Sequence, residues 1–176
     1  MIALSPRIPT AMTPAEALAL SELAAGRTVL EIGSLLGYST IVMANVAKKV
    51  WAIDPHRGYP VADPQPTLNG FLQNLADYQM LDKVIPILGD AREVLPALRG
   101  HFDLIFIDIT RHAGELIFLA NNLDPRWIAL HDYNHPTWTG ATEAIDSFFL
   151  MRSYPMRIVD RLAILDIASA RDAWHE

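Results

Sequence analysis

Five acidic residues that lie in or just after apolar runs are the first groups in this sequence that could do chemistry. They are Glu31, Asp54, Asp90, Asp108 and Asp132. Carboxylates can accept hydrogen bonds from ammonium groups or paired hydroxyls, and they also bind divalent cations. Acids near helix starts can face water for structural reasons alone, but five of them in the same phase favour a binding site.

A glycine loop lies inside the segment 29–40 (VLEIGSLLGYST). A dinucleotide-binding loop needs G-x-G-x-x-G so that the backbone can approach a pyrophosphate, and Leu35 stands at its middle glycine. The loop therefore favours S-adenosylmethionine (SAM), which carries no phosphate, and we expect Gly33, Ser34 and Gly37 to line it. Taken alone, the two glycines would indicate only a tight turn.

SAM offers an ammonium group, a carboxylate, a ribose diol and an adenine, and the sequence supplies a partner for each. An acid at the loop entrance suits an ammonium, a helix start suits a carboxylate, and an acid roughly 20 residues beyond the first glycine suits a ribose. In that order the expected contacts are Glu31, Ser39 with Thr40, Asp54 and, for the adenine, Asp90 with the N–H of Ala91. Asp108 is expected near the methionine arm and the reacting methyl.

If the methyl acceptor is a hydroxyl, three residues are candidates for proton transfer: His131, Asp132 and His112. A histidine tuned near neutral pH is a natural base, and His131 is the best placed. The alternative for each histidine is a polar residue at a strand end. The run 131–138 (HDYNHPTW) suits acceptor recognition, unless it is a surface loop whose Trp138 packs on the core.

The elements that must position these groups alternate along the chain. Strands are expected at 28–32, 50–53, 84–88, 102–107, 127–130, 156–159 and 162–165. Helices are expected from the capping box Thr13-Pro14-Ala15-Glu16, over 39–47 and 68–81, from Gly89-Asp90, over 112–123 and from Thr139.

This alternation predicts an α/β fold with a Rossmann-like, doubly wound, mostly parallel sheet. The last two of the seven strands lie too close for a crossover helix, so a C-terminal antiparallel hairpin is expected. Ligands of such sheets bind at the carboxyl ends of the strands, where the five acids would meet. We expect one domain (1–176), in which an N-terminal helical segment (1–27) precedes a SAM-binding core (28–166).

The composition disfavours several kinds of partner and site. The formal net charge is −6, from 14 basic and 20 acidic residues without a basic stripe, so no nucleic-acid partner is expected. The absence of cysteine removes thiolate zinc sites and thiol nucleophiles. No secretion signal or bilayer-length apolar run is seen, so we expect a cytoplasmic protein with no membrane partner.

Several segments resemble the catechol-type and caffeoyl-CoA-type O-methyltransferases and related small bacterial class I SAM-dependent methyltransferases. They are 29–33 with 37–39 and 43–44, 52–54, 89–91 with 95–96, 102–108 and 130–132. The resemblance implies O-methylation of a small molecule. It also implies a cofactor site lined by Glu31, Gly33, Tyr38, Ser39, Asp54, Asp90, Ala91 and Asp108.

The resemblance also implies a metal. In the metal-dependent branch, an Asp after the fourth strand and an Asp-Asn pair after the fifth hold a divalent ion, which would make Asp108 and Asp132 ligands of Mg²⁺. Tyr133 stands where the Asn is expected, with Asn134 one step on. Arg111 stands where the catechol branch has a lysine base, and arginine is a poor proton acceptor.

Only 28 residues precede Val29, fewer than in these relatives. The acceptor pocket would then be open, completed by a second copy in a homodimer, or built from 55–67 and 133–139. Two other classes stay open: an NAD-type Rossmann oxidoreductase, disfavoured by the loop and the hairpin, and a non-catalytic SAM-fold binding protein.

Overall fold

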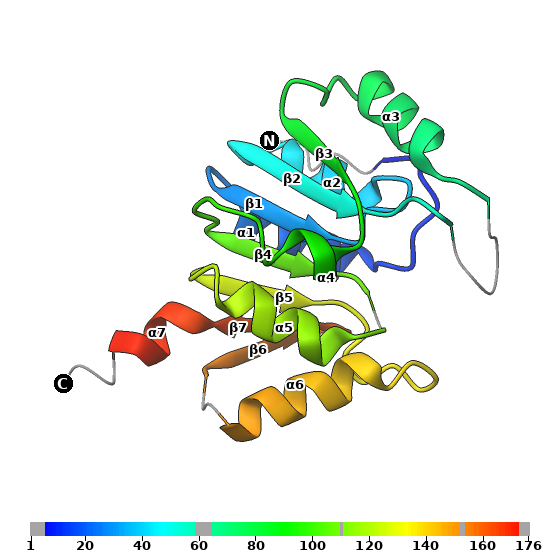
Figure 1. Cartoon of the computed structure of the whole chain (residues 1–176). Coiled ribbons are helices and arrows are strands. Elements are labelled where there is room, and N and C mark those ends of the chain that lie inside the picture. Colours follow the sequence, from blue (N-terminus) through cyan, green and yellow to red (C-terminus); the bar gives the residue numbers. More distant parts are fainter. Residues whose placement is uncertain (1–5, 59–64, 110, 152–153, 173–176) are drawn as a thin grey trace.

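The computed structural model describes residues 6–58, 65–109, 111–151 and 154–172 (Figure 1). Its strands are β1 (Thr28–Ile32), β2 (Lys49–Asp54), β3 (Val84–Leu88), β4 (Leu104–Ile107), β5 (Trp127–Leu130), β6 (Met156–Val159) and β7 (Leu162–Asp166). Its helices are α1 (Pro14–Ala24), α2 (Tyr38–Ala44), α3 (Leu68–Asp77), α4 (Ala91–Val94), α5 (Ala113–Asn121), α6 (Gly140–Met151) and α7 (Ile167–Asp172).

One sheet contains the seven described strands, in the order β3-β2-β1-β4-β5-β7-β6. Strands β1 to β5 pair in parallel, whereas β7 lies between β5 and β6 and runs antiparallel to both. The predicted Rossmann-like sheet with a C-terminal antiparallel hairpin is confirmed. The strand order reverses between β1 and β4, which is where such sheets bind ligands.

Helices cover both faces of the sheet, and each face has its own apolar core (Figure 1). Helices α1, α2 and α3 bury Leu20, Met43 and Phe71 on one face. Helices α4, α5 and α6 cover the other face, where Phe102 and Phe148 are buried. Because the central strands β1 and β4 are covered on both sides, they are almost continuously buried and apolar instead of alternating.

The helix ends differ in detail from the predicted ones. Helix α2 ends at Ala44 instead of residue 47, and α3 ends at Asp77, after which Gln79 takes a φ of +58° and turns the chain toward β3. Helix α7, which begins directly after β7, was not predicted. Among the described helices, none combines the length and apolar character that crossing a bilayer would need.

The amino end of α1 is joined to the turn between β6 and β7. The predicted capping box is confirmed: the Thr13 hydroxyl accepts from Glu16 N–H, and Glu16 Oε2 accepts from Thr13 N–H at 2.7 Å. The Thr13 hydroxyl also donates to Asp160 Oδ2 at 2.6 Å, and Arg161 N–H donates to Glu16 Oε1 at 2.7 Å. Because Arg161 also accepts from Tyr133 N–H, α1 reaches the edge of the sheet where β5 ends.

Candidate active site

The glycine loop after β1 needs both of its glycines. Gly33 and Gly37 have φ values of +92° and +89°, in the left-handed region that side chains rarely adopt. A Cβ on Gly33 would lie 2.6 Å from the carbonyl oxygen of Asp108, so the loop packs directly on the chain that leaves β4. A Cβ on Gly37 would lie 3.0 Å from the ring of Phe71. Close packing therefore explains both glycines without a ligand.

Asp54, at the end of β2, holds this loop in shape. Its Oδ2 accepts hydrogen bonds from the N–H groups of Ser34 and Leu35, both at 2.9 Å, and its Oδ1 accepts from His56 N–H at 2.6 Å. A carboxylate oxygen has two lone pairs, so Oδ2 is fully used and Oδ1 retains one. Asp54 was predicted to accept hydrogen bonds from both ribose hydroxyls, but in this conformation it can accept only one more.

Glu31 lies in β1 and is completely buried. The hydroxyls of Ser39 and Thr40, in the first turn of α2, both donate to its carboxyl group. Burial raises the pKa of Glu31 to about 8; the two hydroxyl bonds oppose this rise, and the charges of Asp108 and Asp54 add to it. Glu31 thus fixes α2 to the sheet and is not exposed to a ligand here, so the direct contact with an ammonium group stays a prediction.

Ser34, in the middle of the loop, has an unsatisfied hydroxyl. Its Oγ is buried and has no hydrogen-bond partner in the part of the chain that the structure describes. Buried hydroxyls are normally paired, so an unpaired one indicates a missing partner such as a ligand or water.

Tyr38, another residue predicted to line the cofactor site, is partly buried and packs against the apolar core on the α1 side of the sheet.

Asp90 follows β3 and caps α4. Its Oδ1 accepts from Arg92 N–H at 2.9 Å, and its Oδ2 pairs with the Arg92 guanidinium at 2.8 Å. The hydrogen bonds from Arg92 lower the pKa of this half-exposed carboxyl to about 2. Ala91 is buried beside it. The structure thus places both predicted adenine contacts at the end of β3, with the Asp90 side chain turned to Arg92.

Asp108, His131 and Asp132 meet at the ends of β4 and β5. His131 Nδ1 lies 3.2 Å from Asp108 Oδ1 and 3.5 Å from Asp132 Oδ1. One potential ligand atom from each residue lies within 4.8 Å of the others. Asp132 has a φ of +63°, a costly conformation for a non-glycine residue that often marks a functional site. Burial raises the pKa of its carboxyl, opposed by the charge of His131.

His131 also contacts Glu16, a residue that sequence reasoning did not place in the site. Its Nε2 lies 3.3 Å from Glu16 Oε2, and both side chains are buried. Burial alone would lower the pKa of His131, but the hydrogen bond to Asp108 and the charges of Asp108, Asp132 and Glu16 outweigh it and raise the pKa to about 9. An imidazolium cannot accept a proton, so this arrangement does not provide the neutral base that was predicted.

The other sequence candidates lie outside this cluster. His112 is the N-cap residue of α5, is exposed, and its Nδ1 lies 4.0 Å from Glu115 Oε2. Tyr133 is buried and donates its hydroxyl to Asp146 in α6 at 3.2 Å, so it turns away from the carboxylates. Asn134 donates its backbone N–H to the hydroxyl of Thr142. The Tyr133 side chain therefore does not replace the asparagine ligand implied by the resemblance.

The segments proposed for the acceptor pocket are only partly visible. Residues 59–64 of the 55–67 loop lie outside the described part of the chain. In the second segment, Trp138 is 41% exposed and stacks on His135, with ring centroids 4.5 Å apart. Trp138 belongs to neither apolar core, so the alternative that it packs on the core is wrong.

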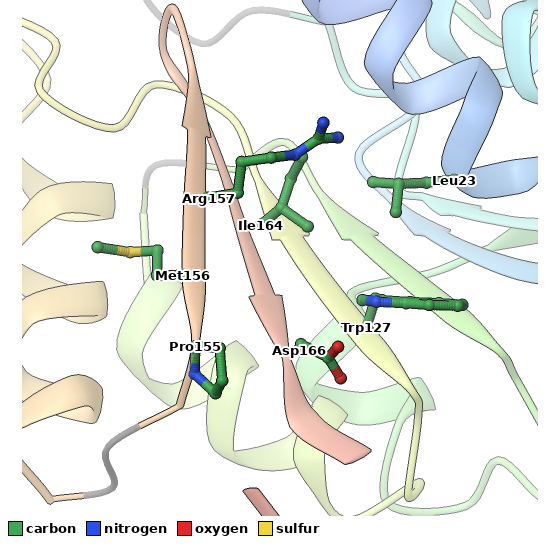
Figure 2. A pocket seen from close by; sticks show the side chains of 7 residues that line it. All are labelled: Leu23, Trp127, Pro155, Met156, Arg157, Ile164 and Asp166. Carbon is green, nitrogen blue, oxygen red and sulfur yellow. The ribbon is translucent and has the colours of Figure 1, made fainter. Parts of the chain in front are cut away.

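A surface pocket lies at the opposite edge of the sheet (Figure 2). Trp127 begins β5 and pairs with Asp166 at the end of β7, so the pocket sits at the amino ends of the parallel strands. Its lining consists of Leu23, Trp127, Pro155, Met156, Arg157, Ile164 and Asp166. It is separate from the acids at the carboxyl ends.

The chain is similar to known methyltransferases. Residues 30–133 match the family model described as a methyltransferase domain. The crystal structure of cofactor-bound Rv0187 from MTB shares 25% identity over 93% of this chain and 84% of that one, with a TM-score of 0.73. No curated protein matches the chain at a significant level.

Two further solved structures share the fold at lower identity. The O-methyltransferase TomG from Streptomyces achromogenes, involved in tomaymycin synthesis and solved in complex with SAM, is 19% identical over 89% of this chain and 81% of that one, with a TM-score of 0.68. The O-methyltransferase from Bacillus cereus, in complex with SAH, is 18% identical over 88% and 82%, with a TM-score of 0.67.

Proposed function

Because the chain belongs to the methyltransferase-domain family, we propose that it transfers the methyl group of SAM to a hydroxyl oxygen of a small molecule. The observation that carries this proposal is the buried Ser34 hydroxyl, which has no hydrogen-bond partner among the described residues and lies between two left-handed glycines. Burying an unpaired hydroxyl costs free energy, and a ligand in the loop would remove that cost. The departure from G-x-G-x-x-G fits a ligand without phosphate.

The chain's own residues would hold SAM along the carboxyl ends of three neighbouring strands. Asp54 would accept one ribose hydroxyl with the free lone pair of Oδ1. Glu31 would act indirectly, by fixing the hydroxyl of Ser39 beside the methionine end. Asp90 and the N–H of Ala91 would flank the adenine, and Tyr38 would cover the loop.

When bound, SAM supplies a methyl carbon activated by its sulfonium leaving group. The residues of the chain then have to hold the acceptor oxygen in line with that carbon and take up the hydroxyl proton. Asp132 is the best-placed acceptor of this proton, because its Oδ1 is buried and free of hydrogen bonds within the described structure and burial raises its pKa toward the useful range. The exposed His112 is the second candidate.

A divalent ion would change the roles of the two aspartates. Asp108 and Asp132 would then hold a cation such as Mg²⁺, which would supply a positive charge to stabilise an oxyanion. Asp132 Oδ1 fits such an ion, because it is buried without a hydrogen bond in the described structure and, of the described groups, the His131 ring, 3.5 Å away, is the one that forms an ion pair with it. The net charge of −6 supports a small acceptor over nucleic acid, and a second copy of the chain is a candidate to complete the acceptor pocket.

A ligand titration followed by an acceptor screen tests the function. At 100 times the Kd, SAM or SAH should stabilise the fold by about 2.7 kcal/mol, which raises the Tm by roughly 5–10 °C for a chain of this size, while NAD(H) should have no effect. Asp54→Asn should lose most of this shift, whereas Asp82→Asn, at an exposed acid after α3, should keep it. Small phenols and catechols are then screened for SAH release, with matched amines as controls.

Each failure has a distinct meaning. A Tm shift with NAD(H) and none with SAM would identify an oxidoreductase. Binding of SAM without SAH release from any hydroxyl or amine would identify a non-catalytic SAM-binding protein. SAH release with amines alone would show that the methyl acceptor is a nitrogen atom and not a hydroxyl oxygen.

A further inference from the structure

The three side chains at the ends of β4 and β5 have the spacing of ligands around one cation. His131 Nδ1 faces Asp108 Oδ1 at 3.2 Å and Asp132 Oδ1 at 3.5 Å, and the three donor atoms lie within 4.8 Å of one another. In an octahedral shell with bonds of about 2.1 Å, adjacent ligand atoms lie about 3 Å apart. A cation could therefore be held with small side-chain movements.

Asp132 has a buried oxygen that no described group hydrogen-bonds, which is a second observation in favour of a cation here. Its side chain is 7% exposed, and its Oδ1 is buried without a hydrogen-bond partner in the described ranges. This oxygen is the one aimed at His131 Nδ1. The backbone of Asp132 is left-handed, with a φ of +63°, which costs free energy in a non-glycine residue.

Glu16 contacts the other ring nitrogen of His131. Glu16 Oε2 lies 3.3 Å from His131 Nε2, with side-chain exposures of 0% and 2%. The carboxylate cannot turn away easily, because its two oxygens also accept from the N–H groups of Thr13 and Arg161. Histidines that bind metals commonly donate their second ring N–H to a carboxylate, which fixes the tautomer and the ring direction.

We propose that His131, through Nδ1, is the third protein ligand of a divalent transition-metal ion held with Asp108 and Asp132, and that Glu16 is the residue that orients its ring. With Nε2–H donated to Glu16, the lone pair of Nδ1 is directed at the cation. The inference deepens the proposed function, on which it rests for the role of the ion, by naming a ligand and a class of metal.

This set of donors changes the expected metal. The resemblance implies an oxygen-donating asparagine directly after Asp132, but Tyr133 stands there and its hydroxyl bonds Asp146. In the proposed site, the imidazole of His131, directly before Asp132, takes the place of that third oxygen ligand. Oxygen-only sites suit Mg²⁺ and Mn²⁺, whereas imidazole nitrogen suits ions such as Zn²⁺, Fe²⁺ and Ni²⁺. Among divalent first-row ions, the affinity of a given site rises from Mn²⁺ through Fe²⁺ and Co²⁺ to Ni²⁺. We therefore expect Mn²⁺ and Co²⁺ to bind more tightly than Mg²⁺.

The test is metal binding to the chelator-treated full chain, independent of turnover. Mn²⁺ is titrated with free Mn²⁺ measured by electron paramagnetic resonance, and bound Mn²⁺ is probed by pulsed resonance for coupling to a ¹⁴N nucleus. We expect one Mn²⁺ per chain, a ¹⁴N coupling, and Mg²⁺ competition only at a large excess. His131→Gln should remove the coupling and weaken binding by on the order of 100-fold, and Glu16→Gln by about 10–100-fold.

Matched variants separate metal binding from helix stability. Thr13→Ala removes the hydroxyl cap of α1 but leaves the contact between Glu16 and His131, so it should lower the Tm as Glu16→Gln does while keeping Mn²⁺ affinity. Tyr133→Phe should also keep it. If His131→Gln does not fold, the ¹⁴N coupling in the wild type decides.

Three results would overturn the inference: no Mn²⁺ binding by the wild type, binding without ¹⁴N coupling, or unchanged affinity in folded His131→Gln. In the first case His131 itself serves as the positive partner of the two aspartates. SAM binding is measured on the same chelator-treated samples. A wild type that binds SAM and transfers methyl groups without binding Mn²⁺ would overturn this inference and leave the proposed function intact.

Discussion

Replacing Glu31 by glutamine should flatten the pH dependence of stability. Burial raises the pKa of Glu31 from 4.5 to about 8 in the folded chain, so the fold binds this proton more tightly than the unfolded chain does. The contribution is complete below the unfolded pKa and is lost as pH rises toward and through 8. At 1.36 kcal/mol for each pKa unit, the loss between pH 5 and pH 9 comes to about 4 kcal/mol.

The neutral amide of Glu31→Gln can hydrogen-bond the hydroxyls of Ser39 and Thr40 without titrating. The assay is urea unfolding at pH 5, 6, 7, 8 and 9, and the measured quantity is the difference in unfolding free energy between the variant and the wild type. His131, whose pKa is raised to about 9, also loses stabilisation as pH rises, but it does so in both proteins and cancels. Parallel curves over this range would refute the reasoning, because they would show that Glu31 is already ionised in the fold at pH 5.

Three other substitutions have defined outcomes. Gly33→Ala places a Cβ 2.6 Å from the Asp108 carbonyl at a left-handed φ, so we expect at least about 2 kcal/mol of destabilisation by urea unfolding and loss of SAM binding by calorimetry; a neutral result would mean that the loop can move away from β4. Tyr133→Phe removes one hydrogen bond to Asp146, so it should cost about 1 kcal/mol in thermal unfolding and leave kcat unchanged, and a large loss of kcat would place the tyrosine in catalysis. Thr13→Ala removes a helix cap and should cost about 1 kcal/mol by the same unfolding measurement, while an unchanged Tm would show that Asp160 and Glu16 hold the helix without it.

The sheet and the position of the acids followed from local patterns. Apolar runs of strand length marked β1 to β7, and an acid in or just after each of the first five strands marked the carboxyl edge. The meeting of Asp108 and Asp132 could be predicted because neighbouring parallel strands end at the same edge. The strand positions depend on hydrophobic periodicity, which is encoded within a few residues.

The partners of the site residues could not be predicted in the same way. Glu16 reads in sequence as the acid of a capping box, which it is, and nothing within the helix reveals that its carboxylate also reaches His131. The direction of the Tyr133 side chain depends on Asp146 in the following helix. Asp54 was predicted to bind a ribose, and the sequence did not show that its Oδ2 accepts from the N–H of Ser34, 20 residues earlier in the glycine loop. Each of these contacts depends on tertiary packing.

The bond between Arg161 and Glu16 joins residues that are 145 positions apart. Closing so long a loop carries an entropic cost that must be met before the contact forms, and contacts of this range slow folding. A chain that emerges from the ribosome in order has its first helix and most of the sheet before the β6–β7 turn exists. Until that turn docks, the Glu16 carboxylate lacks one of its two backbone donors. Maturation of the site is therefore expected to be among the last folding events, and chains released before Arg161 should retain a partial sheet while lacking a properly oriented His131.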